Sequence, residues 1–239
     1  MKACPRSAFA ALLVAALAVA GAARAQPAAA HVERIGDAIH FSGRIEQASA
    51  ARFLQLLQEP GVRRLVITSG GGLVAPALDM AEALRDARLD IEVPSACLSS
   101  CANYLFPAAR HKTLGWRGAV GWHGNMAHVL YLQQTGQGSW GEREMQDARQ
   151  LARREAALFR RLGVDGFVAW FAKIAPYAVS GFYYLSPEDM AGFGIRNVTV
   201  QALGRAPADG DPTPVQVDWP RLQADRPLVP LGDAPASQP

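Results

Sequence analysis

The sequence has few cysteines and, beyond its first 25 residues, no long hydrophobic run and no excess of charge. It contains three cysteines among 239 residues. No apolar stretch after residue 25 approaches the roughly 20 residues that a transmembrane helix needs, so we expect no stable membrane span there. Cysteine and histidine do not occur at zinc-finger spacing. We therefore predict no metal site and no cofactor.

The first 25 residues have the pattern of a secretory signal peptide. Lys2 and Arg6 precede the apolar run AFAALLVAALAVAGAA, which ends in the small-x-small site Ala23-Arg24-Ala25. We expect cleavage after Ala25 and export to the periplasm or the exterior. An uncleaved membrane anchor is the alternative, but the run is short for a membrane span.

The positive net charge of the chain comes from this leader. The formal charge of +3 arises from 24 basic and 21 acidic residues, and the leader holds Lys2, Arg6 and Arg24 but no acid. The rest of the chain is therefore neutral, with 21 residues of each sign. A neutral surface gives no reason to expect nucleic acid or an anionic membrane as a partner.

Hydrophobic periodicity predicts one α/β domain over residues 26–203. Strands and amphipathic helices alternate, with a strand pair, a helix, a strand, a helix and a strand at 34–45, 47–58, 62–69, 74–89 and 90–94. This order is typical of a largely parallel sheet flanked by helices. A charged amphipathic helix is predicted over 143–162. Residues 204–239 are rich in proline and alanine without periodicity, and we predict a mostly disordered tail.

Two motifs follow predicted parallel strands, at the carboxyl ends where the active sites of such sheets gather. The first is the triplet Gly70-Gly71-Gly72, and the second is CLSSCANY, residues 97–104. Ser99 or Ser100 is a candidate nucleophile at a helix start, where unpaired N–H groups favour negative charge. His123, in GWHGN, is the candidate base. Taken singly, each feature also fits a purely structural role.

Residues 40–200 resemble the Clp protease proteolytic subunit and its crotonase-fold relatives. In those proteins a strand ends in Ser-x-Gly-Gly, a serine-bearing turn follows, and a later strand carries a histidine. The matching segments here are 69–72, 99–106 and 117–123. LSPEDMAGFGI is similar to the closing helix of the family. The resemblance is closest to exported Clp-like proteins with a Cys-x-Ser-(Ala or Ser)-Cys signature.

The resemblance implies a ClpP/crotonase-like fold of repeated ββα turns and a tendency to form trimers or hexamers. It also implies a serine-peptidase site with Ser100 as nucleophile and His123 as base. The backbone amides of Gly72 and Cys101 form the implied oxyanion hole. Ser99 remains the alternative nucleophile, because the register of the match is uncertain by one residue.

The chain departs from the family at Phe182, which stands where the family has its catalytic aspartate. Without an orienting acid, the tautomer of the histidine is not fixed and the rate can fall by orders of magnitude. The nearby acids Asp165, Glu188 and Asp189 are candidates for this role, and their spacing selects none of them.

Cys97 and Cys101 are the two cysteines that remain after the leader. If the turn between them is helical, their Cα atoms lie about 6 Å apart, which a disulfide accepts. An oxidising export compartment favours that bond, which would brace the Ser99–Ser100 turn. Two cysteines are too few for a zinc site. A shifted register would make Cys101 a nucleophile, and a disulfide would silence it.

The sequence therefore predicts an exported serine hydrolase, a peptidase that cleaves peptides or unfolded protein through a Ser-His dyad and an acyl-enzyme. A catalytically inactive Clp-like module that binds peptides or assembles is the alternative, favoured by Phe182. An acyl-thioester enzyme of the crotonase type is a third hypothesis. Export argues against it, because acyl-CoA is cytoplasmic.

Overall fold

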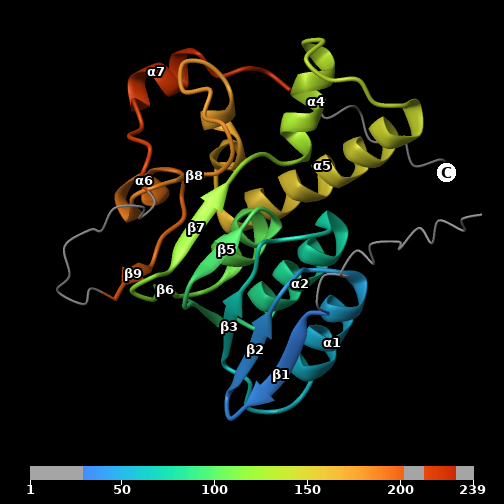
Figure 1. The fold of residues 1–239 in the computed structure, drawn as a ribbon, viewed down its shortest axis with the longest axis vertical. Helices are drawn as coiled ribbons and strands as arrows, with labels where there is room; N and C mark the ends of the chain where they lie inside the picture. The colour runs from blue at the N-terminus through green and yellow to red at the C-terminus, as the bar shows by residue number, and fades with distance from the viewer. Residues whose placement is uncertain (1–28, 202–212, 230–239) are drawn as a thin grey trace, which may run out of the picture.

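The computed structural model describes residues 29–201 and 213–229, which form a mixed α/β fold (Figure 1). Within these residues the larger sheet has six strands in the order β1-β2-β3-β4-β6-β9. β1 is antiparallel to β2, and the other neighbouring strands are parallel. The strands are β1 His31–Ile35, β2 Ala38–Ser42, β3 Arg64–Thr68, β4 Asp90–Val93, β6 Lys112–Leu114 and β9 Val198–Val200. The predicted fold class, α/β with a largely parallel sheet and flanking helices, is confirmed.

A smaller sheet, in the order β5-β7-β8, holds the strands that lead into Ser99 and His123. Its strands are β5 Ala96–Leu98, β7 Ala119–Trp122 and β8 Tyr183–Tyr184. β5 and β7 are parallel, and Leu98 lies opposite Gly121. An isolated bridge between Ser69 and Cys97 joins β5 to the end of β3. The carboxyl ends of β3, β5 and β7 therefore lie next to one another.

Helices α1, Gln47–Leu57, and α2, Val74–Asp86, pack side by side on one face of the larger sheet (Figure 1). Both are crossovers between neighbouring parallel strands, and right-handed crossovers in one direction place their helices on the same face. The helices bury the residues that the periodicity places on their apolar sides, including Ala50 and Phe53 in α1 and Met80 and Leu84 in α2.

Helix α5, Glu142–Leu162, packs against α2. Near its own beginning it also contacts α4, Met126–Gln134. Its apolar stripe is buried, as the sequence predicts. Its charged face is only partly solvated, because Arg154 and Arg161 bind Asp79 and Glu82 of α2 at 2.7 and 2.8 Å. The shorter helical segments are a π-helix Cys101–Leu105, α3 Phe106–Ala108, 3-10 turns Gly166–Ala169 and Phe171–Lys173, and α6 Pro187–Gly192.

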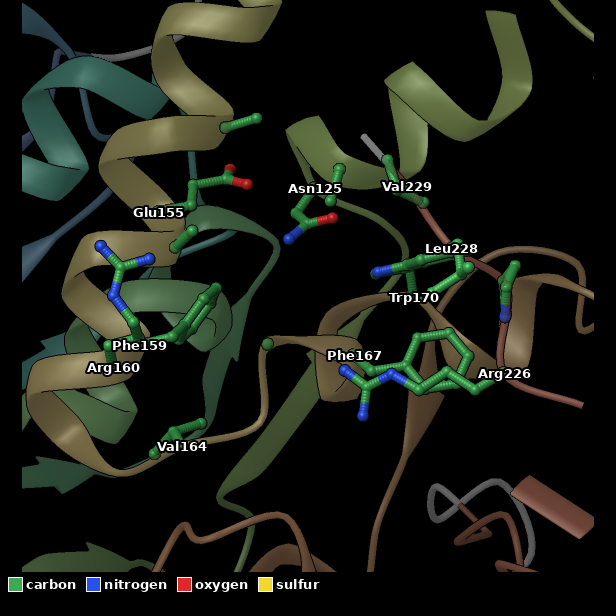
Figure 2. A pocket seen from close by; sticks show the side chains of 15 residues that line it. Asn125, Glu155, Phe159, Arg160, Val164, Phe167, Trp170, Arg226, Leu228 and Val229 are labelled. Carbon is green, nitrogen blue, oxygen red and sulfur yellow. The ribbon is translucent and has the colours of Figure 1, made fainter. Parts of the chain in front are cut away.

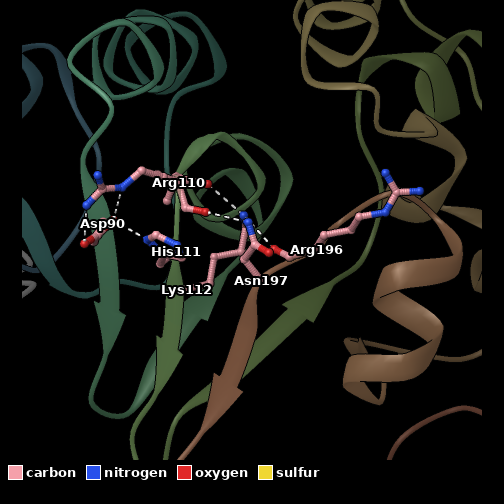
Figure 3. Close-up of polar contacts among 7 residues, drawn as sticks. Asp90, Arg110, His111, Lys112, Arg196 and Asn197 are labelled. Carbon is pink, nitrogen blue, oxygen red and sulfur yellow. Dashed lines mark hydrogen bonds and ion pairs between the residues drawn. The ribbon is translucent and has the colours of Figure 1, made fainter.

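Polar contacts join the start of β4 to the segment before β6, and β6 to the segment before the edge strand β9 (Figure 3). Arg110 grips both carboxylate oxygens of Asp90 at 2.9 and 3.0 Å and holds the pKa of this carboxyl below its usual range. Lys112 is buried and donates from Nζ to the carbonyls of Ala109 and Arg196 at 2.7 and 3.0 Å. Burial lowers its pKa to about 8. These contacts fasten β6 to β9.

Residues 213–229 fall within the segment predicted as a disordered tail, yet they pack on the domain. They include α7, Trp219–Ala224. The backbone amide of Val215 donates to the backbone carbonyl of Tyr184 at 2.9 Å. The ring of Trp219 lies 4.8 Å from that of Phe193. The structure differs here because the packing is irregular and leaves no periodic signal. The rest of the predicted tail, 202–212 and 230–239, lies outside the described residues.

The predicted leader, residues 1–25, also lies outside the described residues. Among residues 29–201 and 213–229, no helix combines the length and the apolar character that crossing a membrane requires.

Candidate active site

The structure brings together two of the predicted site residues, Ser99 and His123. Nε2 of His123 lies 2.7 Å from Oγ of Ser99, a hydrogen-bond distance. The register of the small sheet explains this contact. Ser99 directly follows β5 and His123 directly follows β7, and these strands are parallel with Leu98 opposite Gly121. The amide of Ser99 also donates to the carbonyl of Gly121 at 2.9 Å, which fixes the turn against the neighbouring strand.

Ser99 adopts a left-handed backbone conformation, with φ of +55°. Such a conformation is uncommon for a residue other than glycine and concentrates at functional sites. It turns the chain sharply from β5 into the π-helix and leaves the hydroxyl facing His123. Gly71, which packs against this turn, makes it possible because glycine has no Cβ. A Cβ on Gly71 would lie 2.6 Å from both the Leu98 carbonyl oxygen and Cβ of Ser99.

Ser100, the first-choice nucleophile of the sequence analysis, faces away from His123. Its side chain is 3% exposed and its hydroxyl donates to the Gly72 carbonyl at 2.8 Å. Because Ser100 already lies in the first helical turn, its Oγ is directed into the protein, against the glycine segment. The geometry therefore assigns Ser99, the predicted alternative, to the position facing the base.

The predicted disulfide is present. Cys97 and Cys101 are bonded, with their Cα atoms 5.2 Å apart, and neither residue is exposed. The bond closes a five-residue loop, residues 97–101, with Ser99 at its centre. It thereby joins the end of β5 to the first turn of the π-helix and braces the left-handed turn between them. Cys101 is consequently unavailable as a nucleophile.

The predicted oxyanion-hole amides flank the Ser99 turn. The amide of Ile45 donates to the Gly71 carbonyl at 2.9 Å, and the Leu73 amide donates to the Ile45 carbonyl at 2.8 Å. Neither of these bonds uses the amide of Gly72. On the other side, the amide of Ser100 opens the helical turn, where the first N–H groups lack intrahelical acceptors. Cys101, the predicted second donor, lies one residue further on. The amide that directly follows Ser99 is therefore that of Ser100 and not that of Cys101.

His123 is exposed but has an aromatic neighbour and a cationic one. The ring of Phe182 lies 4.7 Å from the His123 ring in an edge-on arrangement. Desolvation lowers the pKa of His123, and the positive charge of Lys173 lowers it further. Lys173 is fixed beside the ring by donating to the Val179 and Gly181 carbonyls at 2.5 and 3.0 Å. The neutral imidazole, which is the form that accepts a proton, is therefore favoured.

Within the described residues, no carboxylate hydrogen-bonds to His123. Of the three acids considered from the sequence, Asp165 binds Arg226 through both oxygens at 2.6 and 2.7 Å. Asp189 accepts a hydrogen bond from Ser186 at 2.9 Å, at the start of α6. Glu188 is exposed on the same helix. Ser99 and His123 therefore form a hydrogen-bonded pair without a carboxylate, and Phe182 packs edge-on against the histidine ring.

Sequence reasoning missed the buried groups that hold the two halves of the dyad together. Asn103 donates from Nδ2 to the Gly124 carbonyl at 2.8 Å, which ties the π-helix to the histidine loop. Glu155 accepts hydrogen bonds from the Tyr104 hydroxyl and, at 3.1 Å, from the Met126 amide. A signal for Glu155 exists in the sequence. It lies on the apolar stripe of α5, where an acid is unexpected.

Among the described residues, no three side chains of histidine, cysteine, aspartate or glutamate are grouped so that they could hold a metal ion.

No protein-family model matches the chain, and a search of curated proteins finds no match. Solved structures are similar to it. One is a ClpP1 point mutant from Listeria monocytogenes, with 16% identity and a TM-score of 0.42, covering 70% of this chain and 91% of that one. Another is methylmalonyl-CoA decarboxylase, with 9% identity and a TM-score of 0.31. That match covers 40% of this chain and 48% of the decarboxylase, about half its length. Neither similarity assigns a reaction to this chain.

Proposed function

We propose that the protein is a serine hydrolase in which Ser99 is the nucleophile and His123 the general base. The observation that carries the proposal is the 2.7 Å contact between Ser99 Oγ and His123 Nε2. A nucleophile within hydrogen-bond reach of a base, on a turn at the end of a strand, is the arrangement that acyl transfer requires. The strained conformation of Ser99 and the disulfide around it support the same role.

In the proposed mechanism, Ser99 Oγ attacks a carbonyl carbon while its proton passes to Nε2 of His123. The amides of Ser100 and Gly72 donate to the oxyanion of the tetrahedral intermediate. The intermediate collapses to an acyl-enzyme, and the leaving group departs with the proton held by His123. Water, deprotonated by the same histidine, then hydrolyses the acyl-enzyme and regenerates Ser99.

Because no carboxylate of the described residues bonds to His123, the structure sets an expectation for the rate. In triads, disabling the acid while keeping the geometry lowers kcat by about 10⁴, because the histidine loses its orientation and its counter-charge. Packing against Phe182 orients the ring here but supplies no charge. We therefore expect slow turnover, with acyl-enzyme formation more readily detected than steady-state hydrolysis.

The substrate, compartment and assembly belong to the same proposal. Peptides or unfolded protein are the proposed substrates, and the leader pattern at residues 1–25 supports export. The buried Cys97–Cys101 disulfide fits an oxidising compartment. Homo-oligomers, trimers or hexamers, remain a prediction from the sequence resemblance.

The second candidate function is a peptide-binding or assembly module that has the fold but no turnover. The observation that favours it is Phe182, whose ring lies 4.7 Å from His123 at the position of the family's acid. In that case Ser99 would stay unreactive and peptide affinity would not depend on its hydroxyl.

Labelling with a fluorophosphonate probe distinguishes the two. We expect Ser99→Ala and His123→Ala to abolish labelling of the purified protein, and the matched Ser100→Ala variant to retain it if folded. Each variant is checked by circular dichroism. Labelling that persists in Ser99→Ala, or no labelling of the folded wild type, would refute the hydrolase.

A further inference from the structure

A cavity of about 340 Å³ lies beside α5, away from the Ser99 hydroxyl. It is enclosed by α5, the start of α4, the 3-10 turn at 166–169 and the segment 226–229 (Figure 2). Its walls are largely apolar and include Phe159, Phe167, Trp170 and Val229. This volume is within the range of small-molecule pockets, at its lower end.

Glu155 is the polar group that the fold leaves incomplete in this cavity. The residue is 1% exposed. Its Oε1 accepts from the Tyr104 hydroxyl and the Met126 amide, and the Ala127 amide also favours the ionised carboxylate. Its Oε2 is buried and has no hydrogen-bond partner among the described residues. Figure 2 shows the carboxylate projecting from α5 toward Asn125. A buried carboxylate oxygen without a donor is costly, so this atom marks a place for a ligand.

The other charged groups of the cavity do not compensate Glu155. Arg226 lies over the Phe167 ring, with its guanidinium 5.0 Å from the ring centre, and is held by both oxygens of Asp165. Arg160 is exposed and belongs to the rim. The lining therefore presents one carboxylate, that of Glu155, with the side-chain amide of Asn125 beside it, among aromatic and aliphatic walls.

We propose that this cavity binds a small apolar molecule carrying one primary ammonium group, which donates to Oε2 of Glu155. An ionised carboxylate only accepts hydrogen bonds, and an ammonium supplies both donors and the opposite charge. Aromatic walls such as Trp170 and Phe159 favour a cation and an apolar body alike. The ammonium is carried either by a free amine or by the lysine side chain of a peptide.

The proposal also predicts that ligand affinity depends on pH, through the ionisation of Glu155. Burial raises the pKa of Glu155 to about 7, against the opposing effect of its bond from Tyr104. Tyr104 itself stays neutral, because burial raises its pKa well above 10. His128, which stacks on Trp170 at 5.5 Å, is neutral at pH 6 to 8, because its pKa is lowered to about 4. Ammonium binding requires the carboxylate, so affinity must rise as the pH rises through about 7.

The test is calorimetric titration of the purified protein with benzylamine and, as a neutral control of the same shape, benzyl alcohol. At pH 8 we expect benzylamine to bind at least tenfold more tightly than the alcohol, and this preference to shrink severalfold at pH 6. Glu155→Gln should remove the preference, and Ala156→Leu, which fills the cavity, should abolish both interactions. Ser99→Ala should change neither affinity, so the result is independent of hydrolysis.

The two sources of the ammonium are separated by a second pair of ligands. Nα-acetyl-lysine methylamide and its norleucine counterpart differ only in the amine. A preference for the lysine compound assigns the cavity to peptide side chains, and binding of benzylamine alone assigns it to free amines. Equal binding of benzylamine and benzyl alcohol at pH 8, or no binding of either at millimolar concentration, overturns the proposal. If Glu155→Gln fails to fold, the wild-type comparison of ligands and pH decides alone.

Discussion

The ring of Phe182 lies 4.7 Å from the ring of His123, at the position where a catalytic carboxylate would orient the base. The histidine is therefore positioned by packing rather than by charge. Two effects act on its ionisation, desolvation by the surrounding protein and the positive charge of Lys173. Both disfavour the imidazolium. An imidazolium must nevertheless form in the proposed acyl transfer. If Ser99 and His123 act as proposed, we therefore expect Phe182 to limit their reactivity.

We expect Phe182→Asp to raise the reactivity of Ser99 at least tenfold. A carboxylate at this position would raise the pKa of His123, fix its tautomer and stabilise the imidazolium. The measurement is the rate of fluorophosphonate labelling, with the His123 titration followed by NMR. The matched control is Phe182→Asn, which has nearly the same shape without the charge. Equal labelling rates for the two variants would show that a counter-charge is not what the dyad lacks.

Gly71 and Gly70 provide a matched pair for testing the turn. Gly71 has φ of +88°, and a Cβ there would lie 2.6 Å from Ser99 Cβ. A Cβ on Gly70 would meet nothing within 4 Å. We expect Gly71→Ala to cost about 2–4 kcal/mol of unfolding free energy and to remove Ser99 labelling, because strain and overlap add. Gly70→Ala should be close to wild type in both. Denaturant unfolding and labelling measure the two effects. A stable, reactive Gly71→Ala would contradict the close packing of the glycine segment on Ser99.

The parallel sheet and its helices could be predicted because burial leaves periodic patterns in the sequence. Ala50, Phe53 and Leu57 repeat at helical spacing, and the run Leu65-Val66-Ile67 has the apolar character of a central strand. The glycine segment and the cysteine–serine motif can also be predicted from their placement at strand ends, and His123 from its residue type and the family resemblance. Such features are determined by short stretches of sequence, so they can be identified without coordinates.

The choice between Ser99 and Ser100 could not be made from the sequence. Two adjacent serines are chemically equal, and only the φ of +55° at Ser99 decides which hydroxyl faces His123. A left-handed conformation at a serine has no sequence signal of its own, because it is imposed by Gly71, the disulfide and the neighbouring strand. Glu155 differs in this respect. Its place on the apolar stripe of α5 can be recognised from the sequence. However, an isolated acid in a strongly charged helix is easily taken for a surface residue.

The disulfide can be tested with a Cys97→Ala/Cys101→Ala double variant. Closing a loop of five residues stabilises a protein by about 2 kcal/mol in the chain-entropy model. We expect the double variant to lose roughly this much and to label more slowly than its stability alone explains, because the Ser99 turn loses its brace. Alanine is chosen because both positions are fully buried. In the native wild type, alkylation without reductant should find no free thiol at Cys97 or Cys101. Two free thiols in the non-reduced, folded protein would contradict the bond.

Glu155 predicts an unusual dependence of stability on pH. Its pKa is about 7 in the folded protein, against a reference value of 4.5, so the folded state binds the proton more tightly than the unfolded state does. The contribution to stability is therefore fully present below about pH 4.5 and is lost as the pH rises through about 7. At about 1.4 kcal/mol per pKa unit, the loss amounts to about 3 kcal/mol.

Glu155→Gln removes this titration while keeping an acceptor for Tyr104 and Met126. We expect the difference in unfolding free energy between wild type and Glu155→Gln to shift in favour of the variant by about 3 kcal/mol from pH 4.5 to pH 8. Urea unfolding at several pH values measures this difference. Glu142→Gln, at the exposed start of the same helix, is the control and should follow the wild-type profile. Parallel profiles for wild type and Glu155→Gln would mean that the buried carboxyl ionises in the folded protein as easily as in the unfolded chain. The hydrogen bonds from Tyr104 and Met126 would then offset its burial completely.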